Sequence, residues 1–145
     1  MLEKVTNKAQ ITLDMQVAFY DVDSYRVVWH GNYPKYFEIA RCKLLEQIGF
    51  TYEDMEGINH FFPVIDLQIK YVDSLVFDQY FTITATIKEW ENKLVIDYQI
   101  RDAKTQKSIT KAQTTQIAVK MPERITQFEA PKELRDKMAT LLNQK

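Results

Sequence analysis

The sequence has few of the residues that mark disulfide-rich, metal-binding or disordered proteins. Its 145 residues include one cysteine, Cys42, and two histidines, together with 3 glycines and 4 prolines. A single cysteine forms no intramolecular disulfide, and a structural zinc site usually takes about four protein ligands. So little glycine and proline is atypical of disordered or low-complexity chains. We therefore expect a globular protein without a disulfide or a metal site.

Net charge and long apolar runs are also lacking. Lys and Arg total 19 and Asp and Glu total 20, which gives a net charge of −1. This balance argues against a strongly basic nucleic-acid-binding protein. No apolar run approaches the roughly 20 residues of a membrane span, and Met1–Lys8 is too polar for a signal peptide. We expect one cytoplasmic domain over residues 1–145, with no nucleic-acid partner and no membrane span.

The sequence is rich, by contrast, in alternating apolar and polar residues. Residues 11–19 alternate with a period of two, and so do residues 65–71, 81–88 and 94–101. This period predicts strands, and the three residues 91–93 between the last two runs are short enough for a hairpin turn. A longer run, from about Lys107 to Met121, alternates imperfectly, which favours a strand with a bulge.

Residues 33–48 change to a helical period. Their apolar side chains recur at spacings of three and four residues and form one stripe: Tyr33, Tyr36, Phe37, Ala40 and Leu44. Asn32 is expected to cap the start of this helix, and Gly49 is expected to end it. Pro34 is tolerated in the first turn.

Two shorter helices complete the predicted elements. One is expected over Tyr52–Glu56, ended by Gly57. The other begins near Pro131, with an apolar face of Leu134, Met138, Leu141 and Leu142. The order of elements indicates an α+β domain: a five-stranded antiparallel sheet wrapped around one long central helix, plus a C-terminal helix. The sheet and the long helix would each bury the other's apolar face.

The residues that could carry chemistry gather in residues 19–33. Asp21, Asp23 and His30 lie within this segment, directly before the predicted start of the long helix. The first N–H groups of a helix have no partner within it, so they can stabilise an oxyanion, and a nearby carboxylate can act as nucleophile or general base. The alternative is structural: both aspartates are then loop residues, one of them capping a turn, and His30 only begins the helix.

The same segment resembles the signature of the hotdog-fold acyl-CoA thioesterases, in particular the 4-hydroxybenzoyl-CoA thioesterase family and its Tol–Pal-associated relatives. The matching residues are Tyr20-Asp21-Val22-Asp23, Val27-Val28-Trp29-His30-Gly31-Asn32-Tyr33 and Tyr36-Phe37-Glu38-Ile39-Ala40-Arg41. Further matches are Ile87-Lys88-Glu89-Trp90 and the run from Lys107 to Met121. The resemblance covers nearly the whole chain, and it implies a hotdog fold and hydrolysis of an acyl-CoA to a carboxylic acid and free CoA.

The resemblance also implies roles for single residues. Asp23 matches the catalytic aspartate, which attacks the thioester carbonyl or activates water. His30 matches the position whose backbone N–H faces the thioester oxygen, and its side chain would lie near the catalytic carboxylate. Gly31, Asn32 and Tyr33 would bind substrate at the helix start. The family uses no cofactor beyond the CoA of the substrate, and it builds its sites in homodimers or tetramers.

Two positions depart from the family pattern. The hairpin at 91–93 is basic in the family and holds the CoA phosphates, whereas here only Lys93 keeps a charge suited to them. The family also has glycine where this chain has Arg26. If the backbone there adopts an ordinary angle, Arg26 intrudes on the acyl pocket and disfavours long apolar acyl groups.

Other reactive residues are weaker candidates. Glu38 and Cys42 lie on the outer flank of the predicted helix, away from its apolar stripe, and His60 is expected in a loop that leads into a strand. Two other functions remain open. One is a hotdog hydratase or dehydratase, although the histidine of those enzymes precedes the central helix and His60 follows it. The other is a non-catalytic protein that binds acyl-CoA or acyl carrier protein.

Overall fold

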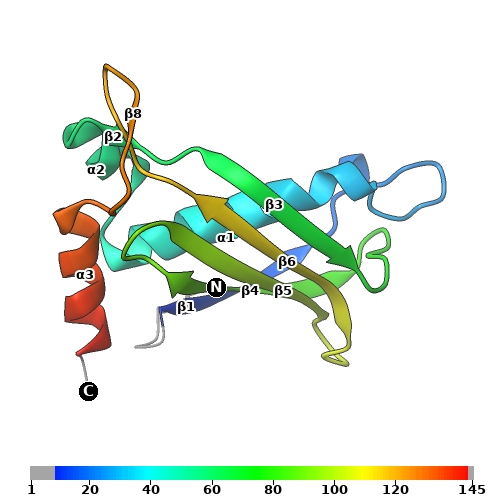
Figure 1. Ribbon diagram of the computed structural model, residues 1–145. Helices are drawn as coiled ribbons and strands as arrows, with labels where there is room; N and C mark the ends of the chain where they lie inside the picture. Colours follow the sequence, from blue (N-terminus) through cyan, green and yellow to red (C-terminus); the bar gives the residue numbers. More distant parts are fainter. Residues whose placement is uncertain (1–8, 144–145) are drawn as a thin grey trace.

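The computed structural model describes residues 9–143, so the expectation for Met1–Lys8 lies outside the described residues. Five strands form an antiparallel sheet in the order β1-β4-β5-β6-β3, and the helix α1 lies across one face of it (Figure 1). The strands are β1 (Gln10–Gln16), β3 (Val64–Tyr71), β4 (Tyr80–Glu89), β5 (Leu94–Asp102) and β6 (Ser108–Gln116). This architecture confirms the predicted α+β fold.

Three helices and a small second sheet complete the described chain. The helices are α1 (Tyr33–Ile48), α2 (Tyr52–Gly57) and α3 (Lys132–Leu142), and the second sheet pairs β2 (His60–Phe61), β7 (Val119–Lys120) and β8 (Ile125–Thr126). The 3-10 turns η1 (Phe19–Asp21) and η2 (His30–Asn32) flank the loop before α1. No helix within residues 9–143 is long and apolar enough to cross a membrane.

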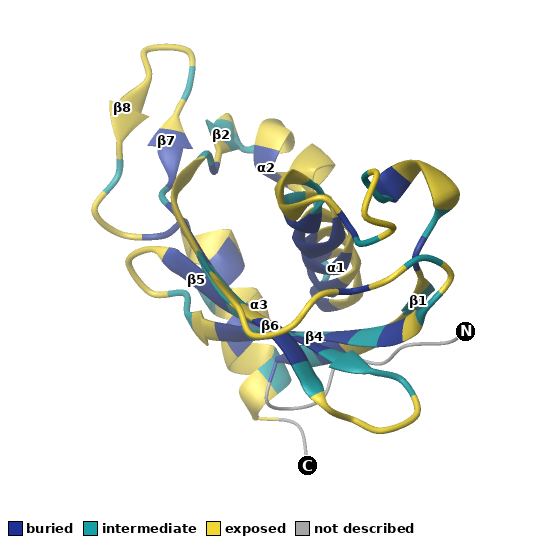
Figure 2. Cartoon of the chain, turned by 90° about the vertical axis from the view of Figure 1, so that its right-hand side faces the viewer, coloured by how far each residue is buried: buried dark blue, intermediate teal, exposed yellow. Residues whose placement is uncertain are grey.

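The core lies between α1 and the sheet, as the two periodicities require. Figure 2 shows the buried residues on the sides of α1 and of the sheet that face each other. The predicted stripe of α1 is fully covered, and alternate residues of the central strands meet it: Phe81, Ile83, Ala85, Leu94, Ile96, Tyr98 and Ile100. Burial of these side chains is the main force that holds the helix in the curve of the sheet.

The ends of α1 are where the sequence predicts, but one cap differs. Gly49 ends the helix in the left-handed conformation, with φ of 81°. Asn32 makes no side-chain cap. Its side-chain nitrogen donates instead to the Asp21 carbonyl at 2.8 Å, so the predicted capping role of Asn32 is wrong. The backbone of Asn32 is already helical because η2 runs directly into α1.

A buried arginine joins α1 to two other elements, α2 and β5. The Arg41 side chain is only 3% exposed and forms an ion pair with Glu38 one turn away. Its Nε donates to the Tyr52 hydroxyl of α2 at 2.9 Å, and an Nη reaches the Tyr98 hydroxyl of β5 at 3.4 Å. Tyr98 in turn shares a hydrogen bond of 2.9 Å with Thr114 of β6. These partners satisfy a charge that would otherwise be costly to bury.

Some predicted boundaries are wrong. The predicted strand 11–19 ends at Gln16, and Phe19 lies in η1 with 78% of its surface exposed. The run Lys107–Met121 divides after Gln116, because Val119 and Lys120 pair in the second sheet rather than in the first. The predicted bulge is present where Ile109 interrupts the pairing of β5 with β6. On α3, Leu134 and Met138 are buried, whereas Leu142 is exposed.

The strand β3 forms an edge of the main sheet, and its apolar side chains are not covered. Ile65, Leu67 and Tyr71 are exposed, although their alternation predicts a buried face. The reason is the placement of α1, which packs against β1 and β4, toward the opposite edge of the sheet from β3. An exposed apolar edge strand is a surface that soluble proteins normally cover.

Candidate active site

The loop before α1 is a tight hairpin that presents Asp23 near its tip. Val22 and Val28 form an isolated antiparallel bridge, and the Asp23 N–H donates to the Val27 carbonyl at 2.9 Å. The Arg26 N–H donates back to the Asp23 carbonyl at 2.9 Å, which closes the turn. The backbone of Asp23 is therefore fixed from both sides.

Asp21 anchors this hairpin to α1. Its side chain is buried, accepts a hydrogen bond of 2.8 Å from the Tyr36 hydroxyl and forms an ion pair with Lys35. Burial, and next the Asp21 hydrogen bond, raise the pKa of Tyr36 well above its usual range, so the hydroxyl remains a donor. The Asp21 carbonyl accepts from both the Trp29 N–H and the Asn32 side chain. These partners give Asp21 a structural role.

Asp23 faces a cavity of about 380 Å³. Its Oδ1 accepts the Tyr25 N–H at 2.8 Å, and the described residues offer Oδ2 no hydrogen-bond donor. The other lining residues are mostly aromatic or apolar: Phe19, Tyr20, Val22, Arg26 and Phe77. A half-buried carboxylate on an apolar wall is suited to act on a carbonyl group bound in the cavity.

Arg26 keeps the backbone conformation that favours glycine. Its φ is 66°, in the left-handed region, so the alternative of an ordinary backbone angle does not apply. The guanidinium lies over the Phe77 ring, 5.4 Å from the centroid, and the Phe77 N–H donates to the Arg26 carbonyl at 3.0 Å. Arg26 therefore forms part of the cavity wall beside Asp23.

Two backbone N–H groups at the helix start come before the first hydrogen bond of the turn. The Asn32 N–H donates to the Trp29 carbonyl at 2.8 Å and closes η2. The amides of His30 and Gly31 come before it in the turn, so no earlier carbonyl of the turn faces them. The dipole of the 16-residue α1 adds partial positive charge at this end.

The side chain of His30 does not contact Asp23. The imidazole is exposed and lies beside the Trp29 indole, with 5.1 Å between the ring centroids. In the hairpin, Asp23 pairs with Val27 whereas His30 lies beyond Trp29, and the Asp23 carboxylate bonds to Tyr25 instead. The His30 backbone thus forms part of the turn at the helix start, whereas its imidazole lies beside Trp29.

Gly31 and Tyr33 have different environments. A Cβ atom on Gly31 would lie 2.3 Å from the Trp29 ring, so the indole covers this glycine directly. Tyr33 is buried in the core, and its hydroxyl accepts the Leu75 N–H at 3.1 Å. Desolvation by burial raises the pKa of Tyr33. Tyr33 therefore fixes the helix start from the core and does not line the cavity of Asp23.

Lys93 lies at the far end of the sheet from Asp23. It is in the β4–β5 turn, where the Glu91 carbonyl accepts the Ala130 N–H in front of α3. Asp23 and Phe77 line the same cavity, and Phe77 comes three residues before β4 begins at Tyr80, at the opposite end of that strand from the turn. Ten residues of strand span about 30 Å. One chain therefore does not bring Lys93 to the cavity of Asp23.

The weaker candidates have other partners. Glu38 pairs with Arg41, and the His60 ring is bonded to the Ile58 carbonyl at 2.7 Å within β2 rather than in a loop. Cys42 is exposed, and desolvation together with Glu38 raises the pKa of its thiol, which disfavours the reactive thiolate. Within the described residues, no three His, Cys, Asp or Glu side chains gather as a metal-binding group.

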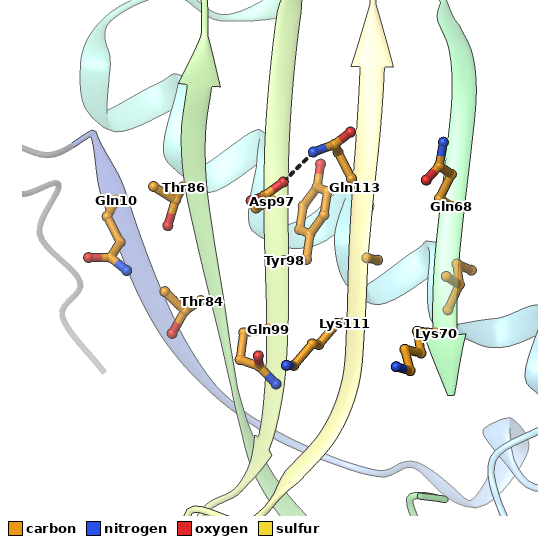
Figure 3. A pocket seen from close by; sticks show the side chains of 12 residues that line it. Gln10, Gln68, Lys70, Thr84, Thr86, Asp97, Tyr98, Gln99, Lys111 and Gln113 are labelled. Carbon is orange, nitrogen blue, oxygen red and sulfur yellow. Dashed lines mark hydrogen bonds between the residues drawn. The ribbon is translucent and has the colours of Figure 1, made fainter. Parts of the chain in front are cut away.

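A larger hollow of about 540 Å³ lies on the sheet (Figure 3). Its lining is mainly polar and comes from all five strands: Gln10, Thr84, Thr86, Asp97, Gln99, Lys111, Gln113, Gln68 and Lys70 among others. Asp97 is the only carboxylate in this lining and already accepts the Gln113 side chain at 2.7 Å. All of its lining residues lie in strands, so none of them belongs to a helix start.

Two residues of the site were not predicted from the sequence. Phe77 lines the cavity, and the Tyr71 hydroxyl donates to the His30 carbonyl at 2.7 Å. Both come from the end of β3 and the connection to β4, more than 40 residues along the chain from the hairpin. Aromatic residues at a strand end have many roles, so their spacing alone gives no signal for this contact.

Comparison with known proteins places the chain in a family. Residues 17–140 match the model of the thioesterase-like superfamily. The chain is 30% identical over 107 residues to the Bacillus subtilis (strain 168) protein named "Putative acyl-CoA thioesterase YneP". The aligned residues cover 73% of this chain and 77% of that protein.

Solved structures share the fold. Slr0204, a 1,4-dihydroxy-2-naphthoyl-CoA thioesterase from Synechocystis, superposes with a TM-score of 0.79 at 20% identity, over 92% of this chain and 95% of that one. A 4-hydroxybenzoyl-CoA thioesterase variant bound to 4-hydroxybenzoyl-CoA superposes with a TM-score of 0.78 at 18% identity, over 90% of this chain and 99% of that one. The chain has a hotdog fold and belongs to the thioesterase-like superfamily.

Proposed function

We propose that this protein hydrolyses an acyl-CoA thioester at the cavity beside Asp23. The observation that carries the proposal is the half-buried Asp23 carboxylate on an aromatic cavity wall, held by a hairpin that Asp21 joins to the start of α1. Membership of the thioesterase-like superfamily supports the same reaction. The chemistry requires a carboxylate and an oxyanion site, and the hairpin carboxylate and the helix start are the groups of this segment suited to those roles.

In the proposed reaction, Asp23 acts on the thioester carbonyl carbon as nucleophile or as general base toward water. The carbon–sulfur bond breaks, and the CoA sulfur leaves as a thiolate that takes up a proton. The acyl carbon gains the oxygen of one water molecule, so the products are a carboxylic acid and free CoA. When Asp23 attacks directly, the same water hydrolyses the mixed anhydride that forms first.

The backbone amides of His30 and Gly31 are the proposed oxyanion donors. They precede the first closed turn of the helix, and the α1 dipole favours negative charge at this end. Removal of one such donor in other enzymes costs roughly 10² to 10³ in rate. Asn32 is proposed to act indirectly, because its side chain ties the helix start to the Asp21 carbonyl.

The complete site is proposed to need a homodimer, alone or within a tetramer. The exposed apolar edge of β3 supports this assembly, since a second copy would cover it. The distance between Lys93 and Asp23 in one chain agrees with it, because a phosphate-binding Lys93 would have to come from another chain. No metal or redox group is proposed, and CoA enters only as part of the substrate.

The test is thiol release from a panel of acyl-CoAs that includes short, medium and aromatic acyl groups, among them 4-hydroxybenzoyl-CoA and 1,4-dihydroxy-2-naphthoyl-CoA. We expect release with at least one of them, and a loss of several orders of magnitude in Asp23→Asn, which keeps size but removes the charge. The matched comparison is Asp21→Asn, which should reduce activity less than Asp23→Asn, because the Asp21 carboxylate bonds to Tyr36 and Lys35 and does not line the cavity.

Other outcomes of the panel would point to the alternative functions. Hydration of an enoyl-CoA without thiol release would indicate a hydratase. Binding of acyl-CoA or acyl carrier protein without turnover would indicate a binding protein. Equal rates for wild type and Asp23→Asn would overturn the role of Asp23.

A further inference from the structure

The Tyr71 hydroxyl bonds to the backbone at the helix start. Tyr71 is the last residue of β3, and its hydroxyl donates to the His30 carbonyl at 2.7 Å, a normal length for such a bond. Desolvation by burial raises the pKa of Tyr71, so the phenol keeps its proton and remains a donor at neutral pH. The family assignment does not account for this contact.

The acceptor of this bond determines what the bond can do. The His30 carbonyl and the Gly31 N–H belong to one planar trans peptide unit, in which they point in opposite directions. A donor that fixes the carbonyl therefore also fixes the direction of the Gly31 N–H. The preceding peptide is fixed in the same way, because the Trp29 carbonyl accepts the Asn32 N–H at 2.8 Å. Both proposed oxyanion donors thus have their peptide planes held from the carbonyl side.

The Tyr71 ring is itself held in place. It meets the buried Tyr33 ring edge to face, with 5.1 Å between centroids and an interplanar angle of 83°. Two further bonds join the same parts of the chain: the Val28 N–H donates to the Leu75 carbonyl at 2.8 Å, and the Leu75 N–H donates to the Tyr33 hydroxyl at 3.1 Å. Loss of the Tyr71 hydroxyl alone would leave these contacts in place, so its effect can be measured in a folded protein.

We infer that Tyr71 is a positioning residue for the oxyanion site: its hydroxyl holds the His30–Gly31 peptide so that the Gly31 N–H faces the thioester oxygen. A hydrogen bond to the carbonyl also polarises the peptide and strengthens the N–H as a donor. Both effects are greatest when negative charge develops on the oxygen, so they act on the transition state more than on substrate binding. The inference rests on the proposed function.

The experiment compares Tyr71→Phe with Tyr80→Phe, an exposed tyrosine at the first residue of β4, on the best substrate of the panel. For Tyr71→Phe we expect kcat to fall about tenfold with KM changed less than about twofold. Misalignment of one oxyanion donor should cost less in rate than its complete removal. Tyr80→Phe should match wild type. In ¹⁵N spectra, Tyr71→Phe should shift the Gly31 amide, whereas Tyr80→Phe should not.

Each result has a distinct meaning. If kcat of Tyr71→Phe equals that of Tyr80→Phe, or if only KM changes, the positioning role is wrong. A fall in kcat that disappears when rates are corrected for folded protein would also overturn it. If wild type releases thiol from none of the acyl-CoAs, the proposed function fails, and the Gly31 amide shift then decides by itself whether Tyr71 holds this peptide.

Discussion

The Arg26 guanidinium lies over the Phe77 ring while the Arg26 backbone is left-handed, with φ of 66°. The hairpin therefore keeps a turn that glycine would form without strain, and it gains a cationic side chain on the wall of the Asp23 cavity. The two properties can be separated, because the conformation belongs to the backbone and the stacking belongs to the side chain.

Arg26→Gly should shift substrate preference toward longer apolar acyl chains. The glycine keeps the turn and removes the guanidinium from the cavity wall, so kcat/KM for medium-chain acyl-CoAs should rise relative to short-chain ones. Arg26→Ala is the matched control. It should give a similar substrate profile but be less stable than Arg26→Gly by about 1 kcal/mol, since alanine also disfavours the left-handed region. An unchanged chain-length profile in both folded variants would show that Arg26 does not limit the acyl group.

Gly31→Ala should displace the Trp29 indole and reduce thiol release. The new Cβ would lie 2.3 Å from the ring, a distance that forces the half-exposed indole to move. Because Trp29 precedes the helix start, we expect altered tryptophan fluorescence together with a lower kcat. Gly57→Ala is the control, since a Cβ there meets nothing within 4 Å. Unaltered fluorescence in Gly31→Ala would contradict the tight contact.

Protonation of Asp102 should lower the stability of the protein in acid. The Thr105 N–H and, next, the Gln79 side chain hold the pKa of Asp102 at about 2, below its usual value of 3.8. A carboxylate with a lowered folded-state pKa stabilises the protein above its unfolded-state pKa, and this contribution is lost as the pH falls from about 4 to about 2. Urea unfolding at pH 5, 4, 3 and 2 should therefore show a smaller loss in Asp102→Asn than in wild type. Parallel losses over this range would exclude the linkage.

The edge strand β3 should hold two copies together. We expect light scattering at micromolar concentration to give at least the mass of a dimer. Leu67→Lys should shift the protein toward monomer, because it places a charge among the exposed apolar side chains of this edge. Phe128→Lys, which changes a 90% exposed residue elsewhere, should leave the mass unchanged. A wild-type monomer would argue against both the assembly and a site shared between chains.

Local periodicity accounts for most of the fold. The stripe of α1 and the alternation of β4 and β5 depend on contacts that each element makes with one continuous core, so their bounds and buried faces follow from the sequence. The exposed face of β3 does not follow from it, since alternation cannot show which strands α1 covers. The split after Gln116 was missed for a similar reason: Val119 pairs with residues far along the chain.

The site was predictable only in part. The resemblance located the Asp23 hairpin and the helix start, and backbone hydrogen bonds over a few residues build both of them. The left-handed angle of Arg26 does not follow from the sequence, because the residue type opposes it and only the closed hairpin requires it. The contacts from Phe77 and Tyr71 depend on how the β3–β4 connection returns to the hairpin, which no local pattern encodes.

The buried network around Arg41 has a consequence for changes in chain length. Arg41 is fixed against α2 and β5 by hydroxyl groups, eight residues after Tyr33 begins the helix. One residue inserted between them would rotate the helix start by about 100° and shift it by about 1.5 Å along the axis. The segment from Tyr33 to Arg41 therefore works as a spacer of set length: side chains on its outer face can be exchanged, but a single insertion or deletion would shift the helix start, and the Asp21 contacts that join it to the hairpin, relative to the Arg41 network.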